Sequence, residues 1–248
     1  MNRLILGRER SPTEPGIFRK LSLVAFMAWI GLGSDGISSS CYGPQEAFLG
    51  LGGHGSLAII LALLTALTVF IISASYIQII ETFPTGGGSY LVASKLLAPP
   101  VGMVAGCALI VDYVLTIAVS IASGSDAVFS FLPLAWQHYK LPTSFAILIF
   151  MIILNLRGVK ESVKPLVPIS VIFILTHCVV ILYAVFSHLP DVPLLMERTT
   201  GEMHSSISQL GLGGTLFLIL HAYSLGGGTY TGIEAVSNGM PYLREPRV

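Results

Sequence analysis

The stretch GSDGISSSCYGP, residues 33–44, interrupts an apolar segment that is otherwise long enough to cross a membrane. LSLVAFMAWI precedes it by two residues and QEAFLG follows it directly. A helix that only anchors a chain is not expected to contain such residues at its centre. Aspartate and serine are polar groups that cost free energy there, and glycine and proline interrupt the helical backbone. We therefore expect the first membrane helix to be broken here, with its backbone arranged around a cation.

The composition is that of a polytopic membrane protein. Hydrophobic residues make up 53% of the chain and charged residues only 10%, against about 25% charged residues in soluble domains. The formal net charge is zero, so the sequence gives no basis for a nucleic-acid partner. The predicted fold class is an all-α membrane protein in contact with the lipid bilayer.

Six stretches are long and apolar enough to be membrane helices, each of which needs about 20 residues. After an N-terminal tail at 1–19, they are predicted at 20–48, 55–80, 101–132, 143–157, 165–188 and 210–241. The first and the last of them contain polar interruptions, so helices 1 and 6 are predicted to be broken.

Lysines and arginines favour one orientation of these spans. If the spans alternate in direction, only Lys140 and Arg198 fall on the side of the membrane opposite the N-terminus. Positively charged loops stay in the cytoplasm, so the N-terminus is predicted to be cytoplasmic, in a multi-pass protein of the cell (inner) membrane. The residues on the cytoplasmic side are Arg3, Arg8, Arg10, Arg19, Lys20, Lys95, Arg157, Lys160, Lys164, Arg244 and Arg247.

The last span is interrupted by HAYSLGGGTYTGIEAVSNGMP, residues 221–241, much as the first is. Each interruption has glycines, then hydroxyl side chains, with an acid nearby and a proline that closes the segment. Two spans interrupted by glycine and proline in corresponding places indicate a transporter with inverted repeats and a binding site near the membrane midplane. The alternative is that the glycines only permit close helix packing, but packing does not require acids.

Asp35, Asp112, Asp126 and Glu234 all fall within the predicted spans. No lysine or arginine lies near a span's centre to pair with them, so each must meet water, a cation or a backbone group, or stay protonated. An acid held in this way can exchange a proton for a cation, and we expect Asp35 and Glu234 to take part in proton coupling. Asp126 is more consistent with an interfacial position, and Asp112 points away from the neighbouring hydroxyl groups.

The third span carries Tyr113, Thr116 and Ser120 at positions i, i+3 and i+7, which form one stripe on a helix. The three hydroxyls could simply bond to their own helix. A hard monovalent cation, however, prefers oxygen ligands from carboxylates, hydroxyls and backbone carbonyls. We therefore predict a cation site, with no cofactor and no metal other than the transported ion, formed by Asp35, Tyr42, Tyr113, Thr116, Ser120 and Thr231.

Several segments together resemble the APC superfamily of permeases, and within it the KimA-type branch, which is related to the KUP potassium-uptake proteins. The resemblance extends from about residue 20 to 248 and implies a LeuT-like fold with two inverted five-helix repeats and proton-coupled potassium uptake. It also implies potassium ligands at Asp35, Tyr113, Thr116, Ser120 and Thr231, with Tyr42 and Glu234 near that site. The segments are DGISSSCYGPQEAFL, FPTGGGSYLVASKLL, AGCALIVDYVLTIAVSIASG, LNLRGVKES and TGIEAVSNGMPYLREP.

The family has a complete second repeat followed by a cytoplasmic regulatory domain, whereas this sequence supplies one repeat and the first helix of the next. We expect the chain to be a fragment or a truncated frame that does not transport by itself. The resemblance also implies that the full-length protein can form a homodimer. A truncated half that assembles with a second chain is another interpretation.

Two other functions were weighed against potassium–proton symport. Amino-acid members of the superfamily hold the substrate carboxylate on bare amides of the broken first helix, and Asp35 would repel that group unless it were protonated or ion-bound. An amino acid permease of the APC type is the alternative function. An enzyme is not expected, because PTGGGSY lacks the lysine of a phosphate-binding loop. His177 and His221 are predicted to be core residues, with a proton relay as the alternative.

Overall fold

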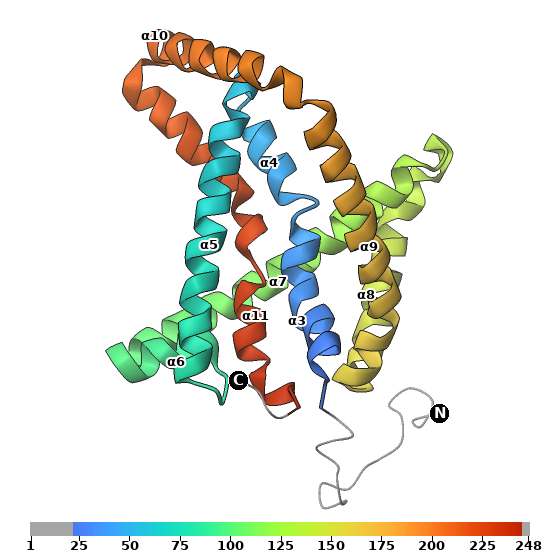
Figure 1. Ribbon diagram of the computed structural model, residues 1–248. Coiled ribbons are helices and arrows are strands. Elements are labelled where there is room, and N and C mark those ends of the chain that lie inside the picture. Colours follow the sequence, from blue (N-terminus) through green and yellow to red (C-terminus); the bar gives the residue numbers. More distant parts are fainter. Residues whose placement is uncertain (1–21, 245–248) are drawn as a thin grey trace, which may run out of the picture. The chain divides into compact units, whose positions relative to one another are not determined.

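The computed structural model describes residues 22–244, which form helices joined by short turns (Figure 1). The all-α fold is therefore confirmed for this range. The α-helices are α3 (Ala25–Ser39), α4 (Gly43–Gly50), α5 (Ala58–Thr82), α6 (Gly88–Val92), α7 (Pro99–Ser130), α8 (Lys140–Leu156), α9 (Val159–Ser187), α10 (Val192–Leu225) and α11 (Ile233–Asn238). Shorter helical turns are η1 (Gly55–Leu57), η2 (Ala93–Leu97), η3 (Leu134–Tyr139), η4 (Leu189–Asp191), η5 (Gly226–Tyr230) and η6 (Met240–Tyr242).

Some of the predictions fall on residues outside the described range. These are the cytoplasmic tail at 1–19, the start of the first span and six of the basic residues used for the orientation. The six are Arg3, Arg8, Arg10, Arg19, Lys20 and Arg247.

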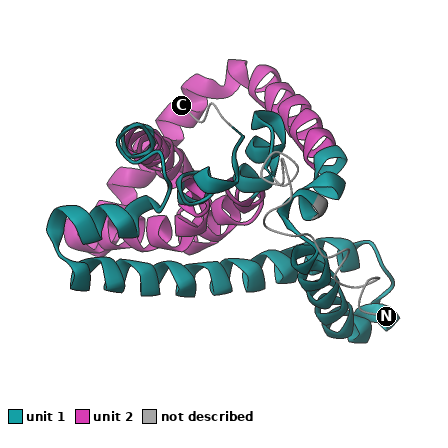
Figure 2. Ribbon diagram, turned by 90° about the horizontal axis from the view of Figure 1, so that it is seen from below, with its two compact units in different colours: residues 1–34, 76–169, 234–248 teal, residues 35–75, 170–233 magenta. Residues whose placement is uncertain are grey.

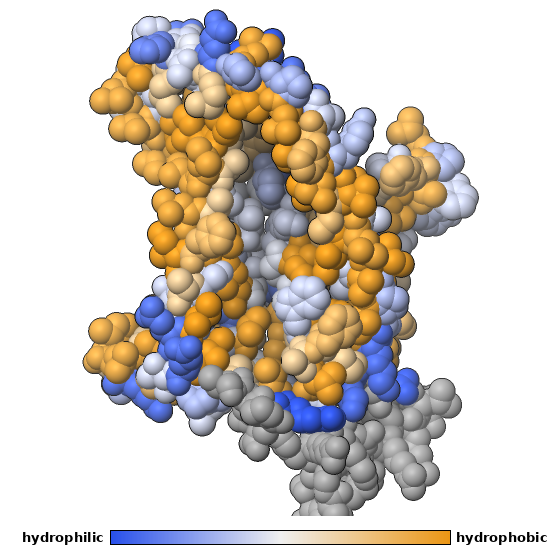
Figure 3. Space-filling model, viewed as in Figure 1, coloured by the Kyte–Doolittle hydropathy of each residue, from blue (hydrophilic) through white to orange (hydrophobic). Residues whose placement is uncertain are grey.

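Within residues 22–244, five helical segments are long and apolar enough to cross a membrane, and each overlaps one of the last five predicted spans. At most 22% of the most apolar window in any of them is buried, so their side chains present the kind of surface that lipid covers. Figure 3 shows apolar side chains along α5 and α9 and polar ones on the first part of α10. The chain is a multi-pass membrane protein. The segments are Gly55–Thr82, Pro99–Ser130, Leu134–Leu156, Ser162–Ser187 and Leu189–Asn238.

The first predicted span, 20–48, contains two helices, α3 and α4, each too short to be counted among those five. The predicted position of its interruption was wrong in detail, because α3 continues through Asp35 as far as Ser39. The Oγ atoms of Ser38 and Ser39 donate hydrogen bonds to the carbonyl of Asp35, at 2.9 and 2.8 Å. These bonds satisfy a carbonyl near the helix end, so the interruption is confined to residues 40–42.

The last predicted span begins earlier than expected, because α10 starts at Val192 rather than near 210. Gly211 has φ 74° and ψ 166°, so the residues before and after it form two separate helical pieces. The second piece ends at Leu225 and is followed by η5. Thr231 is then extended, with φ −64° and ψ 149°, Gly232 has φ 86°, and α11 begins.

The chain divides into two compact units (Figure 2). Unit 1 contains the residues up to Ser34, Tyr76–Ile169 and the residues from Glu234 onward. Its core packs Leu23 and Ala28 against Val163, with Leu243 alongside. Two backbone hydrogen bonds, from Leu23 N to Tyr242 O at 2.8 Å and from Arg244 N to Leu23 O at 2.9 Å, join the start of α3 to the segment that follows α11.

Unit 2 contains Asp35–Ser75 and Ser170–Ile233. Its apolar core joins α4, η1 and α5 to the second piece of α10, and it buries Ala47, Leu51, Leu57, Leu61, Ile219 and Ala222. This packing holds the interruption after α3 and the interruption after α10 in the same unit.

Candidate functional site

In unit 2 the segment at 226–232 packs directly on the end of α3. A side-chain Cβ on Gly232 would lie only 2.7 and 2.8 Å from Cβ and Cγ of Asp35, and 2.6 Å from the backbone nitrogen of Gly36. A Cβ on Gly36 would lie 3.5 Å from the carbonyl oxygen of Thr231. The structure therefore brings Asp35 and Thr231, which are 196 residues apart in the sequence (231 − 35), into one neighbourhood.

Tyr42 joins the same neighbourhood from the turn between α3 and α4. Its hydroxyl lies 3.0 Å from the Oγ of Ser39, which is fully buried. A Cβ on Gly228 would come within 2.9 Å of the Tyr42 ring, and a Cβ on Gly43 would overlap the side chain of Thr229. Glycine at these positions permits two stretches of backbone to approach closely. Three of the predicted ligands, Asp35, Tyr42 and Thr231, thus gather in unit 2.

The other three predicted ligands, Tyr113, Thr116 and Ser120, lie on α7 in unit 1. All three are half-buried, whereas Val114, Leu115 and Ile117 between them are more than half exposed. The predicted stripe therefore coincides with a packed face of α7. Since Asp35 belongs to unit 2, the assembly of all six residues around one ion stays a prediction.

Unit 1 contains a polar contact that the sequence did not reveal. Asn238, the last residue of α11, donates a hydrogen bond from Nδ2 to the hydroxyl of Tyr113, at 2.9 Å. Glu234, the predicted proton-coupling acid, lies one turn earlier on α11 and is buried, with 9% of its surface exposed. Asn238 was missed because its partner lies 125 residues away, and no local pattern joins the two. Its amide in a Gly/Pro-interrupted span was the available signal.

The remaining two acids behave differently from Asp35 and Glu234. Asp126 forms an ion pair with Lys140, the first residue of α8, and both side chains are partly exposed. That pairing is consistent with an interfacial place for Asp126 and supplies the basic partner that the sequence did not suggest. Asp112 is half-buried on α7 beside Tyr113.

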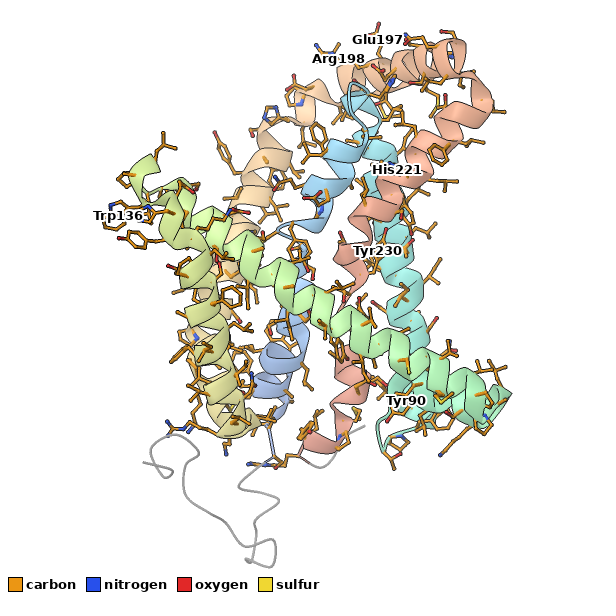
Figure 4. The ribbon with its side chains drawn as sticks, turned by 180° about the vertical axis from the view of Figure 1, so that it is seen from behind. Tyr90, Trp136, Glu197, Arg198, His221 and Tyr230 are labelled. Atoms are coloured by element: carbon orange, nitrogen blue, oxygen red, sulfur yellow. The ribbon has the colours of Figure 1, made fainter. Side chains whose placement is uncertain are left out.

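The prediction that His177 and His221 are core residues is wrong, because both side chains are exposed. His177 stacks on Phe173, with ring centroids 3.7 Å apart, and its Nδ1 lies 2.8 Å from the carbonyl oxygen of the same residue. His221 lies on α10, with its ring 6.0 Å from that of Phe217 (Figure 4). Contacts within their own helices accommodate these rings without burial in a core.

A cavity of about 890 Å³ in unit 1 lies between α7 and α8. Its lining is mainly apolar, from residues such as Ile121 and Phe145, and it includes none of Tyr113, Thr116 and Ser120. Among residues 22–244, no three His, Cys, Asp or Glu side chains gather as they would around a transition metal. The predicted site combines one carboxylate with neutral oxygens, the ligand set of a weakly held monovalent cation.

The comparisons with known proteins agree with this helical architecture. The family model described as amino acid permease matches residues 21–241, which is most of the chain, and the chain belongs to this family. The resemblance to the APC superfamily is thereby confirmed, and the members of the family are transporters.

A curated relative narrows the comparison. The chain is 33% identical over 255 aligned residues to the potassium transporter KimA of Bacillus subtilis (strain 168), an alignment that includes 99% of this chain. This supports the resemblance to the KimA-type branch. The chain spans 40% of the length of that relative.

Proposed function

We propose that this chain is part of a secondary transporter that takes up potassium together with protons through a cation site near the membrane midplane. The chain supplies one five-helix repeat and the first helix of a second, inverted repeat, and the N-terminus faces the cytoplasm of the cell. The potassium ligands are Asp35, Tyr42 and Thr231 from unit 2 and Tyr113, Thr116 and Ser120 from α7.

The observation that carries the proposal is the contact between Gly232 and Asp35. It supports a site in which an acidic side chain and an extended backbone segment lie together at membrane depth. Irregular backbone is tolerated there only where it is buried in protein or lines a wet cavity. A dehydrated potassium ion takes its ligands from carboxylate, hydroxyl and carbonyl oxygens, which are the groups that Asp35 and the extended segment contain.

Proton coupling follows from two acids in different surroundings. In this proposal Asp35 is a ligand of the ion, and Glu234 is buried on α11. A cation that approaches a carboxyl group competes with the proton on it. Exchange of a proton for potassium is thereby coupled to transport. The coupling predicts that uptake rises when the outside is made more acidic than the cytoplasm.

The test is rubidium uptake in a bacterial strain that lacks its own potassium-uptake systems. The strain would express the full-length gene product that contains this chain, either wild type or Asp35→Asn. The wild type should accumulate rubidium, and Asp35→Asn should reduce uptake to background while its amount in the membrane stays the same. Normal uptake by the variant would refute the cation site.

Asp126→Asn provides the matched control. It also removes one carboxylate from a membrane helix, but Asp126 is partly exposed and paired with Lys140, an arrangement that contributes about 1 kcal/mol or less. Uptake should therefore persist. Equal losses in both variants would attribute the effect to any missing charge rather than to Asp35.

The second candidate function is amino acid transport, which the description of the matching family favours. In that case backbone amides of the broken first helix would receive the substrate carboxylate, and Asp35 would have to be neutral or ion-bound. Uptake of a labelled amino acid mixture without rubidium uptake, by a well-expressed protein, would decide for this alternative.

A further inference from the structure

The end of α11 contacts α7 through one side chain in unit 1. Asn238 Nδ2 donates to the Tyr113 hydroxyl at 2.9 Å, while Asn238 Oδ1 is buried and has no hydrogen-bond partner among the described residues. The Asn238 amide is therefore held to Tyr113 by the hydrogen bond that its Nδ2 group donates. Leaving a buried amide oxygen unsatisfied is costly, so this arrangement calls for a reason beyond packing.

Glycines at the start of α6, residues 86–88, contact Asn238 and its neighbours from the other side. Gly88 has φ 47°, and a Cβ there would overlap Asn238 Oδ1. Gly86 has φ 85°, and a Cβ there would lie 2.7 Å from Pro241 Cδ and 3.3 Å from the carbonyl of Ser237. Because both backbone conformations favour glycine, this segment can lie flat on the end of α11 and keep the amide directed at Tyr113.

We propose that Asn238 is a positioning residue that orients the Tyr113 hydroxyl toward the transported cation. The inference rests on the proposed function, in which Tyr113 is a ligand, and adds to it a residue outside the predicted site. A phenol oxygen both donates and accepts hydrogen bonds. Donation from Asn238 fixes the phenol oxygen in place, in the position from which it binds the ion in this proposal. A ligand fixed beforehand binds more tightly, because less freedom is lost on binding.

The experiment measures rubidium uptake against rubidium concentration for the full-length protein. Asn238→Ala should raise the KM about tenfold, the largest change that loss of one ordinary hydrogen bond supports. The maximal rate per transporter in the membrane should stay the same. Ser237→Ala is the control, since Ser237 is a buried neighbour on α11 whose Oγ has no hydrogen-bond partner among the described residues, and its KM should equal that of the wild type.

A second pair of variants separates positioning from a structural role. In a Tyr113→Phe background the hydroxyl is gone, so adding Asn238→Ala should raise the KM no further. Additive increases, or a lower maximal rate with the wild-type KM, would overturn the inference. Asn238→Leu, which keeps the volume and removes the donor, replaces the alanine variant if the latter does not reach the membrane.

The outcomes also separate this inference from the proposed function. A wild-type protein that does not take up rubidium would refute the proposed function and the positioning role with it. Rubidium uptake that depends on Asp35, together with a wild-type KM in Asn238→Ala, would leave the potassium site intact and refute only the role of Asn238.

Discussion

The two interruptions that meet in unit 2 are stabilised in different ways. After α3, the backbone is closed by tight hydrogen bonds, such as those from Cys41 N to Ser38 O at 3.0 Å and from Tyr42 N to Ser39 O at 3.3 Å. After α10, Thr231 is extended and Gly232 has a positive φ, so the chain opens away from helical geometry. The α3 side of the contact therefore presents side chains, Asp35 from the last turns of α3 and Tyr42 from the interruption, whereas the second interruption presents backbone.

This difference matters for a cation site, which needs both kinds of oxygen. A carboxylate supplies charge, and freed carbonyls replace part of the ion's hydration shell. Glycine is required mainly in the second interruption and at the contacts between the two. The comparison can be tested by adding single methyl groups or removing single hydroxyl groups at these contacts.

The largest effect is expected for Gly232→Ala. A residue other than glycine with φ 86° costs about 1–3 kcal/mol, and the new methyl group would also collide with Asp35 and the backbone of Gly36. We expect loss of rubidium uptake and a Tm of the purified full-length protein lower by several degrees. Gly227→Ala is the control, because Gly227 has open space around it, and it should behave as the wild type. Uptake by Gly232→Ala would mean that the close approach to Asp35 is dispensable.

A smaller but clear effect is expected for Gly43→Ala. Gly43 is buried in the first turn of α4, and a methyl group there would overlap the Thr229 side chain and lie 2.8 Å from the Thr229 backbone nitrogen. Overpacking against backbone costs about 1–3 kcal/mol. Uptake should fall and the Tm should decrease. Adding Thr229→Ser to Gly43→Ala should restore neither, because the contact with the Thr229 backbone nitrogen remains. An unchanged Tm would show that the two interruptions are not tightly packed.

The sequence indicated long apolar helices because apolar runs are a local signal, and five such helices are present among the described residues. It placed the interruption after α3 too early, since glycine and serine near Asp35 suggested irregular backbone, whereas the serine hydroxyls there stabilise the helix end. The first piece of α10 was missed, because a polar sequence such as ERTTGEMHSS has no membrane-length apolar run. The helix α9 begins at Val159, before Pro165 and Pro168, although proline ordinarily marks a helix start.

The residues of the candidate site stay a prediction, and the contacts around them could not be read from the sequence. The sequence indicated Asp35, Tyr42 and Thr231 because acids and hydroxyls are costly in apolar spans and mark functional sites there. The structure places these three residues in one neighbourhood of unit 2. The contacts of Asn238 with Tyr113 and of Gly88 with Asn238 depend on tertiary packing between distant segments. A single sequence carries no local signal for such pairs.

An intermediate effect is expected for Tyr42→Phe. The substitution removes the hydroxyl that lies 3.0 Å from Ser39 Oγ but keeps the ring that packs on Gly228. Loss of one hydrogen bond lowers the free energy of unfolding by about 1 kcal/mol. If the hydroxyl is also a ligand, the KM for rubidium should in addition rise a few-fold. Ser39→Ala is the comparison variant: it leaves the Tyr42 hydroxyl in place and removes this hydrogen bond together with the one from Ser39 Oγ to the Asp35 carbonyl. Equal KM values for the two variants would limit Tyr42 to a structural role.

The smallest effect is expected for Gly36→Ala, the counterpart of Gly232→Ala on the α3 side of the same contact. Gly36 lies within α3, and a Cβ there would be 3.5 Å from the Thr231 carbonyl oxygen, an ordinary van der Waals distance. Alanine is favoured over glycine inside a helix by about 1 kcal/mol, so the Tm should stay the same or rise slightly and uptake should persist. If uptake were lost in Gly36→Ala as it is in Gly232→Ala, the α3 backbone would have to leave helical geometry during transport, and the difference between the two interruptions would not hold throughout the cycle.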